Sequence, residues 1–391
     1  MPTNLPPEAK YKWGEASAAK TREEKLRLLR EFLSLVPKHK GTAKLRVQVK
    51  KQMTALRREM EESKRRRAGK GGPKFFVQKE GSAQLAIIGL TNVGKSSLLV
   101  ATTNANVRVS PHLYTTRKPV PGMLVYEDLQ FQLVETPSLM EGSSDGKAWG
   151  LQTLALARNA DGLILMVDLS QDPIGQLFSV EKELERARIF VTKPQSHVEV
   201  EKKSMGVGLR IVLFGKLVQC TIREVERLLR SYSITDAVVK VHGEATLDEI
   251  EESIFESTVY KPAVVVANKA DHDSSGSEVR KLEAEIDNEL PIISVSCKTQ
   301  KGLTELGKVL FEVLDIVRIY TKEPKRKKFS KTPFILRKGA TVSDLAENVH
   351  SDFRRKFSFA KIWAERLAFS PQKVGSTFKL EDGDIIEIHT R

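Results

Sequence analysis

Cysteine is scarce in this chain, with only Cys220 and Cys297 in 391 residues. They lie far apart and match neither the spacing of a disulfide framework nor that of a zinc site. Apolar runs are short, and none reaches the roughly 18 residues that a membrane-spanning helix needs. Residues 1–8 contain no apolar segment of the signal-peptide type. We therefore expect a cytoplasmic, reduced protein without a membrane span.

Acidic side chains are few at the start of the chain. Residues 1–80 hold 22 lysines and arginines against 9 glutamates, so they carry a net charge of +13 out of +14 for the whole chain. Such asymmetry indicates an anionic partner, either nucleic acid or a membrane surface. A solvated, disordered basic arm is the alternative.

The basic segment is predicted to form a helical hairpin. Residues 1–20 are polar, and we expect little regular structure in them. Apolar residues then recur at helical spacing, and Thr21 with Glu24 fits a capping box at the helix start. A second helix is expected over residues 42–60, before a flexible basic linker at 64–73. Without interleaved aromatic residues, such a hairpin suits contact with a phosphate backbone better than base reading.

The most informative motif is Gly89-Leu-Thr-Asn-Val-Gly-Lys-Ser96. It follows the apolar run 85–88, which reads as a buried strand, and precedes a stretch at 97–100 that can continue as a helix. Strand, then G-x-x-x-x-G-K-S, then helix is the context that a phosphate-binding P-loop requires. The flanking strand and the Lys-Ser pair disfavour the alternative, a glycine-rich surface turn.

Each residue type in this loop has a physical role. Gly89 and Gly94 let the backbone curl so that successive N–H groups point at phosphate oxygens, and the helix N-terminus adds its positive end. Lys95 would reach the β- and γ-phosphates, and the Ser96 hydroxyl would ligate Mg²⁺. We therefore expect a nucleotide here, with further contacts from Asn92, Val93 and Ser97.

A second motif, at residues 114–123, contains two adjacent threonines. In P-loop GTPases a threonine in this first switch loop completes the Mg²⁺ shell and senses the γ-phosphate. Thr116 is our candidate for this role, and Thr115 is the alternative.

The strand expected at 129–134 leads into Glu135-Thr-Pro-Ser138-Leu139, where an ordinary GTPase has Asp-x-x-Gly. Glu135 keeps the charge on a side chain one methylene longer, and Ser138 can donate its N–H but lacks the torsional freedom of glycine. Leu139 stands where many such enzymes carry the glutamine that orients the attacking water. Glycine and small residues at 141–146 favour a mobile second switch; the alternative is a switch that moves little and hydrolyses slowly.

The base-reading motif comes late in the chain. After a buried strand at 163–168, residues 169–262 intervene before the strand 263–267. The intervening sequence predicts helices and a strand, and we interpret 187–258 as a small inserted α/β domain.

Asn268-Lys-Ala-Asp271 matches N-K-x-D, whose aspartate pairs with the N1–H and N2–H₂ donors that guanine presents together and adenine does not. Residues 294–298 resemble the S-A-K loop that touches guanine O6; Cys297 there replaces alanine, and we do not expect a reactive thiol. The predicted guanine-side contacts are Asn268, Lys269, Asp271, Ser296, Cys297 and Lys298.

The chain ends in a further predicted domain. A helix at 303–317 is expected to close the nucleotide-binding domain, and a basic connector follows at 325–328. Residues 332–391 then read as strand, helix and terminal strand.

The order of these parts resembles the developmentally regulated GTP-binding proteins, in the Obg branch of translation-factor-like GTPases, over roughly residues 21–391. The resemblance rests on the basic hairpin before the P-loop, on Glu224–Ala237 and Tyr260–Pro262 in and after the insertion, and on an end that looks like a TGS domain. TGS is a β-grasp module shared with threonyl-tRNA synthetase and stringent-response enzymes. The implied fold is α/β, with a basic hairpin and linker (1–80), a P-loop GTPase domain (81–186 and 259–320), the inserted α/β domain (187–258) and a TGS domain (330–391).

The family resemblance implies hydrolysis of GTP to GDP with Mg²⁺, and association with ribosomes, rRNA or tRNA through the hairpin and the TGS domain. A protein cofactor is a further expected partner. Asn92 matches the P-loop asparagine that binds K⁺ in related GTPases, and Leu139 matches a hydrophobic replacement of the catalytic glutamine. Together they predict slow, K⁺-stimulated hydrolysis, with Lys95, Thr116 and Glu135 as the catalytic residues.

Two other functions compete with a GTPase switch. An RNA-binding or assembly protein could use guanine nucleotide as a structural ligand with little turnover. An ATPase is the other, because one Obg-branch family with a TGS domain has altered its base-reading motif. The intact Asn268 and Asp271 pair argues against an ATPase.

Overall fold

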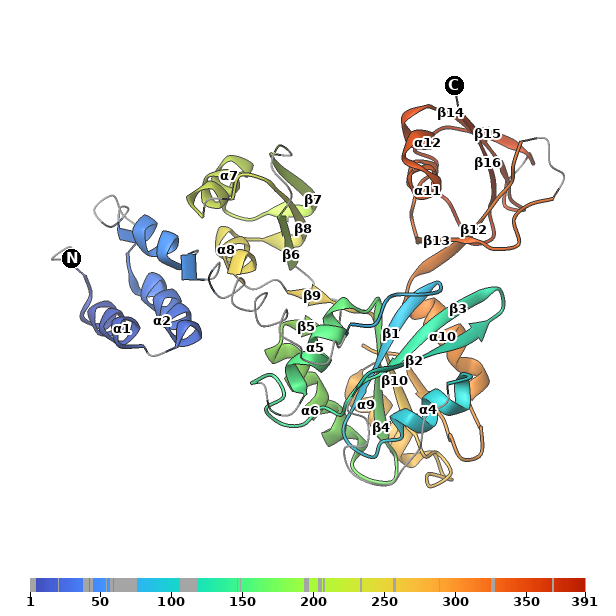
Figure 1. The fold of residues 1–391 in the computed structure, drawn as a ribbon, viewed down its shortest axis with the longest axis horizontal. Helices are drawn as coiled ribbons and strands as arrows, with labels where there is room; N and C mark the ends of the chain where they lie inside the picture. Colours follow the sequence, from blue (N-terminus) through green and yellow to red (C-terminus); the bar gives the residue numbers. More distant parts are fainter. Residues whose placement is uncertain are drawn as a thin grey trace. The chain divides into compact units, whose positions relative to one another are not determined.

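The computed structural model describes residues 5–390 except 20, 38–41, 43–44, 54, 57–58, 60–75, 106–117, 146, 148, 193–196, 203–205, 207, 233, 256–257, 288, 325–327 and 368. The chain divides into two compact units (Figure 1). Unit 1 combines Met1–Lys74 with Pro194–Thr258, and unit 2 combines Phe75–Lys193 with Val259–Arg391. The helices among the described residues are too short or too polar to cross a bilayer.

Unit 1 begins with helices α1 (Pro7–Ala18) and α2 (Arg22–Leu35), and residues 45–53 are also helical. The expectation of little structure before residue 20 is wrong. Trp13 of α1 packs against Phe32 of α2 with ring centroids 5.0 Å apart, because small alanines beside Trp13 complete an apolar face that composition conceals. Of the capping box predicted for α2, the structure shows the N-cap half, in which the Thr21 side chain accepts a hydrogen bond from the Glu24 N–H at 3.1 Å.

The rest of unit 1 is a small three-stranded sheet with two helices. The sheet has the order β6-β8-β7, with β6 antiparallel and β7 parallel to β8. Its apolar face packs against the helices, around the fully buried Val225, Leu229 and Ile250. The elements are β6 (His197–Lys202), β7 (Leu209–Leu217), α7 (Ile222–Ser231), β8 (Ala237–Ala245) and α8 (Leu247–Phe255).

Polar contacts join the N-terminal helices of unit 1 to this sheet-and-helix part. The Lys50 ammonium lies 2.7 Å from the Glu251 carboxylate of α8 and 4.4 Å from the centroid of the Tyr232 ring. The Tyr232 hydroxyl donates to the same carboxylate. Lys50, a cation of the basic segment, is therefore engaged inside the unit.

Unit 2 contains a six-stranded sheet of order β11-β10-β4-β1-β3-β2, parallel throughout except for the β2–β3 hairpin. Successive residues such as Ile87 and Ile88 are both fully buried, as expected when helices cover both faces of a parallel sheet. The strands are β1 (Ala83–Gly89), β2 (Val120–Tyr126), β3 (Leu129–Glu135), β4 (Gly162–Asp168), β10 (Ala263–Asn268) and β11 (Ile292–Ser294).

Helices cover both faces of this sheet (Figure 1), with one hydrophobic cluster on each face. Helices α4 (Lys95–Thr102) and α10 (Leu306–Val313) pack on one face. Helices α5 (Gly150–Asn159), α6 (Pro173–Arg186) and α9 (Ser277–Ile286) pack on the other. The carboxyl ends of β1, β3, β4 and β10 meet at one edge, where ligands of open α/β sheets bind.

The chain leaves and re-enters unit 2 at neighbouring points. Strand β5 (Ile189–Phe190) pairs in parallel with β9 (Val259–Tyr260) in a two-stranded sheet. The residues between them are those in which the sequence predicts an inserted domain.

The C-terminal part of unit 2 is a five-stranded sheet of order β13-β12-β16-β14-β15. Helices α11 (Val342–Val349) and α12 (Ser351–Arg355) pack on one face, around residues such as Leu345, Ala360 and Ile362. The strands are β12 (Ile316–Thr321), β13 (Phe334–Arg337), β14 (Phe357–Trp363), β15 (Gln372–Val374) and β16 (Ile385–Thr390).

The helix predicted over 303–317 is wrong at its end. A 3-10 turn at Leu303–Glu305 leads into α10, which ends at Val313. Asp315 adopts a left-handed conformation at φ 51°, and β12 begins at the next residue. Apolar spacing continues unbroken across this point, so periodicity alone does not reveal the change. The C-terminal sheet thus includes a strand that precedes residue 330, where we expected that domain to begin.

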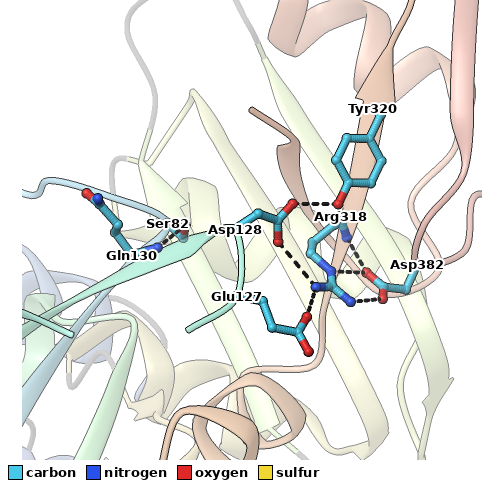
Figure 2. Close-up of polar contacts among 7 residues, drawn as sticks. All are labelled: Ser82, Glu127, Asp128, Gln130, Arg318, Tyr320 and Asp382. Atoms are coloured by element: carbon cyan, nitrogen blue, oxygen red, sulfur yellow. Dashed lines mark hydrogen bonds and ion pairs between the residues drawn. The ribbon is translucent and has the colours of Figure 1, made fainter. Parts of the chain in front are cut away.

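Figure 2 shows how β12 contacts the tip of the β2–β3 hairpin. The Arg318 guanidinium lies 3.2 Å from Asp128, contacts Glu127, and donates to Asp382 at 2.8 Å. The Tyr320 hydroxyl donates to Asp128. The C-terminal sheet is thereby bonded to the hairpin that ends at Glu135.

Candidate functional site

The predicted P-loop joins the end of β1 to the start of α4. Gly94 stands before the first helical residue with φ 98°, a conformation that favours glycine. A Cβ atom there would meet Nδ2 of Asn268 at 2.2 Å. At Gly89 a Cβ would meet the carbonyl oxygen of Met166 at 2.6 Å. The loop is therefore a close-packed cradle in which both glycines are required.

Lys95 is folded against this loop. Its ammonium donates to the carbonyl oxygens of Gly89 at 3.1 Å and Leu90 at 2.6 Å, and to the Ser138 hydroxyl at 2.8 Å. Burial lowers the Lys95 pKa to about 8, while the nearby carboxylate of Glu135 opposes the shift. A buried ammonium surrounded by carbonyls gains from an anion that can replace those contacts.

The Ser96 hydroxyl donates to the carboxylate of Glu135, at the end of β3. These two oxygen donors suit Mg²⁺, which binds one or two protein oxygens together with substrate phosphates. No three His, Cys, Asp or Glu residues gather into a metal site of their own within the described ranges. The donor set therefore fits an ion shared between protein and phosphate. The remaining predicted Mg²⁺ ligand, Thr116, and its alternative Thr115 lie outside the described residues.

The segment after Glu135 also contacts the P-loop through its backbone. The Leu139 N–H donates to the Gly89 carbonyl at 3.2 Å. The Leu139 side chain is buried in the core beside residues such as Ile88 and Val134. At this position the chain therefore offers packing rather than a polar group that could orient water.

Sequence reasoning missed Glu183, on α6. Its buried carboxylate accepts hydrogen bonds from the N–H groups of Gly142 at 3.0 Å and Ser144 at 2.7 Å. Burial would raise the pKa of Glu183, but these backbone bonds outweigh it and hold the pKa below its usual value. The sequence could have identified Glu183, because it is a charged residue next to Leu184 on the apolar face of an amphipathic helix. The loop predicted as the second switch is anchored here.

On the guanine side, Asn268 bridges two loops. Its Nδ2 donates to the Val93 carbonyl at 2.9 Å, and its Oδ1 accepts from the Cys297 N–H at 3.2 Å. The Ser296 hydroxyl donates to Asp271 at 2.7 Å, and this bond lowers the pKa of the Asp271 carboxyl. A charged carboxylate is the form that accepts hydrogen bonds from a base.

Lys269 and Cys297 complete this side. The Lys269 ammonium forms an ion pair with Asp168, at the end of β4. Asp168 also accepts from the Ser170 N–H at 2.9 Å and hydroxyl at 2.6 Å. Sequence reasoning missed Asp168. A charged residue at the carboxyl end of a buried strand, at the edge where ligands bind, could have identified it. Burial raises the pKa of the Cys297 thiol to about 11, so it is protonated at neutral pH.

Three other predicted residues lie around this centre. Asn92 is exposed in the P-loop with φ 64°, and Lys298 is exposed after Cys297. Ser97 is half-buried on α4. The structure thus brings the P-loop, the end of β3 and the Asn268 loop together.

Three family models match the chain. Residues 84–200 match a model described as a 50S ribosome-binding GTPase, and residues 206–316 match the C-terminal region of the same domain. Residues 317–390 match the TGS domain.

Several curated proteins are similar along almost the whole chain. An uncharacterised GTP-binding protein of Methanocaldococcus jannaschii is 34% identical over 369 residues, 94% of this chain and 92% of the relative. Developmentally-regulated GTP-binding protein 2 of Homo sapiens is 31% identical over 365 residues, 93% of this chain and 98% of the relative. Among solved structures, the YchF GTPase of Schizosaccharomyces pombe is similar with a TM-score of 0.45 and 16% identity, covering 80% of this chain and 99% of that one.

Proposed function

Because this chain belongs to the developmentally regulated GTP-binding proteins, we propose that it hydrolyses GTP with Mg²⁺ and changes state with the bound nucleotide. The observation that carries the proposal is the pair of contacts Lys95–Ser138 and Ser96–Glu135. Both phosphate-loop side chains bond directly to residues 135–138, which form the end of β3 and the segment after it. A ligand that takes over either side chain must therefore rearrange that segment.

We assign the phosphate and metal roles to this cluster. Lys95 exchanges its carbonyl partners for the β- and γ-phosphates. The Ser96 hydroxyl and the Glu135 carboxylate hold Mg²⁺, with Thr116 as a further ligand. When bound, the ion neutralises charge on the phosphate oxygens.

The guanine roles fall to the loops that Asn268 bridges. The ionised Asp271 accepts the guanine N1–H and N2–H₂ donors, and Asn268 holds the P-loop and the 296–298 loop in register. Adenine offers no such donor pair, so a competition titration should show GTP displacing ATP.

Hydrolysis is proposed to be slow and stimulated by K⁺. Leu139 is apolar and buried, so the chain has no amide there to orient water. Asn92 offers an exposed amide oxygen in the P-loop that suits a monovalent cation. Asn92→Ala should abolish the difference between turnover in KCl and in NaCl, and a K⁺ stimulation that persists in this variant would reject the role of Asn92.

We further propose that the chain is cytoplasmic, consists of the four domains predicted above with β12 moved into the TGS domain, and binds ribosomal or transfer RNA and a protein cofactor. The family model's description as ribosome-binding supports this, as do exposed cations of the basic segment such as Lys10, Arg27 and Lys51. Arg46 is engaged internally, because it donates to the carbonyls of Leu33 at 2.8 Å and Val36 at 2.7 Å.

The test is co-sedimentation with ribosomes in GTP, in GDP and without nucleotide, together with phosphate release. Charge reversal at the exposed cations is preferable to deleting residues 1–74, because deletion would also remove Lys50 from Glu251. The proposal expects GTP-dependent binding that Lys95→Ala abolishes. Equal binding in all three states without phosphate release would instead indicate a structural nucleotide.

A further inference from the structure

The C-terminal sheet has a face opposite its helices. Along β14, Ala360 and Ile362 are fully buried against the helices, so the intervening residues point the other way. Strand pairing places His389 opposite Phe359, and Lys373 opposite Lys361. We define the outer face by six residues, Lys322, Phe359, Lys361, Trp363, Lys373 and His389.

Aromatic rings and lysines alternate on the outer face. The rings of Phe359 and His389 stack with centroids 4.3 Å apart and an angle of 11° between their planes. The Lys373 ammonium lies 4.2 Å from the Phe359 centroid, and that of Lys322 lies 4.1 Å from the Trp363 centroid. Partly buried rings on β14 and β16 therefore stand next to cations on β15 and just after β12.

The outer face is positive around Phe359 and Lys361. Glu387, which points to the same side, is buried there and is bonded to His389 at 2.7 Å. Further carboxylates, Glu365, Glu381 and Asp384, line a pocket beside Trp363. The ammonium groups of Lys322 at 3.7 Å and Lys361 at 4.0 Å share the Glu387 carboxylate. Three lysines thus surround one buried acid, and the side chains of Lys361, 43% exposed, and Lys373, also exposed, are accessible to an anion.

We propose that the outer face binds single-stranded RNA, with bases stacked on Phe359, His389 and Trp363 and phosphates on Lys361 and Lys373. This inference deepens the proposed RNA association and rests on it. A base stacks on an aromatic ring more strongly than an ammonium does at an exposed site, so a base displaces Lys373 from Phe359 and the freed ammonium pairs with a phosphate. A duplex keeps its bases stacked on one another and would not use the rings.

The same chemistry separates RNA from an acidic polypeptide. Glutamate and aspartate side chains would use the lysines but would leave the ring faces as they are. Trp363 therefore reports which ligand class is bound, since its fluorescence changes when a base stacks on the indole.

The experiment uses the full chain with Trp13→Phe and Trp149→Phe, which leaves Trp363 as the sole tryptophan. Titration with a ten-nucleotide oligouridylate should quench its fluorescence saturably. Lys361→Gln with Lys373→Gln should weaken binding and reduce the slope of log affinity against log salt by about 1.4, the value for two lost single-strand phosphate contacts. Lys338→Gln with Lys379→Gln is the matched control, because it removes the same charge from exposed positions of the same domain.

Quenching of Trp363, together with weaker binding in Lys361→Gln/Lys373→Gln but not in Lys338→Gln/Lys379→Gln, supports the inference. Binding that leaves Trp363 fluorescence unchanged, or that both pairs weaken equally, overturns it. The inference is also overturned if decaglutamate displaces the RNA completely and the RNA itself does not quench Trp363. If the chain does not co-sediment with ribosomes but RNA still quenches Trp363, the proposed function alone is rejected. If the chain co-sediments with ribosomes but RNA does not quench Trp363, this inference alone is rejected.

Discussion

The guanidinium of Arg318, on β12, lies 3.2 Å from the carboxylate of Asp128, at the tip of the β2–β3 hairpin (Figure 2). Arg318 also binds Asp382 through its backbone N–H at 2.7 Å and through Nη2 at 2.8 Å. Hydrogen bonds to Asp382, and then to Glu127 and Asp128, raise the pKa of Arg318 against the effect of burial. One side chain thus bonds the TGS sheet to the hairpin that carries Glu135.

Arg318→Ala should loosen this junction. The carboxylate partners of Arg318 are 28–55% exposed and become hydrated once the guanidinium is gone, so the free energy of unfolding should fall by about 1–2 kcal/mol. Amide exchange at residues 127 and 128 should also accelerate. Denaturant unfolding and hydrogen exchange measure the two effects.

Lys338→Ala is the control for Arg318, because Lys338 and Asp315 form a 3.9 Å pair with side chains 73% and 70% exposed. It should change stability by less than about 1 kcal/mol. Equal losses from the two variants would contradict the assigned role of Arg318.

The affinity for GTP should depend on pH through Lys95. Burial lowers its pKa to about 8 in the free protein, and bound phosphates restore the charged form, so binding takes up a proton. Affinity is then constant below pH 8 and falls above it, by about tenfold between pH 7 and pH 9. Calorimetry in buffers of different ionisation enthalpy measures the uptake. Lys95→Arg stays charged over this range, so its affinity should be weaker but flatter with pH; a parallel fall in both proteins would refute the assignment.

Gly94→Ala should damage the nucleotide site more than its backbone strain alone predicts. A Cβ there meets Asn268 Nδ2 at 2.2 Å, whereas Gly276, with φ +67°, has nothing within 4 Å of a built Cβ. Both alanines carry left-handed strain of about 1–2 kcal/mol. Only Gly94→Ala adds an overpacking cost of about 1–3 kcal/mol, so its GTP affinity should fall about ten- to hundredfold. Unchanged nucleotide affinity in Gly94→Ala, with its fold intact, would reject the close-packed cradle.

The family, the P-loop GTPase fold and the TGS domain were all predictable, because their motifs impose backbone geometry. Gly89 and Asn268 stand where buried parallel strands end, and Gly94 stands at the start of the following helix. Continuous apolar runs locate those strand ends in the sequence. The family matches confirm the family and the fold class, while the roles of the individual site residues remain predictions.

The remaining features depend on tertiary contacts that spacing does not encode. The helix α1 gains its apolar face only when Trp13 meets Phe32. Asp315 ends a helix in the middle of a continuing apolar pattern, because aspartate tolerates the left-handed conformation. From the sequence alone, Glu183 would be taken for a surface charge. Only the folded structure brings the N–H groups of Gly142 and Ser144 to its carboxylate.

The stability of unit 1 should depend on pH through Glu251. Burial would raise the pKa of Glu251, but hydrogen bonds from Lys50 and Tyr232 outweigh it and hold the pKa below its usual value. Such a lowered pKa contributes stability that is present above the unfolded pKa and is lost as pH falls through the folded one. The wild-type chain should therefore lose stability on acidification towards pH 4.

Glu251→Gln should be less stable at pH 7, by roughly 1–3 kcal/mol, and should depend less on pH. Glu244→Gln is the matched control in the same unit, because Glu244 pairs with Lys216 at 2.8 Å with both side chains more than half exposed. Glu244→Gln should keep both the stability and the acid sensitivity of the wild type. Denaturant unfolding at pH 7, 5 and 4 separates the variants, and equal acid sensitivity of Glu251→Gln and the wild type would show that Lys50 does not anchor the basic helices through Glu251.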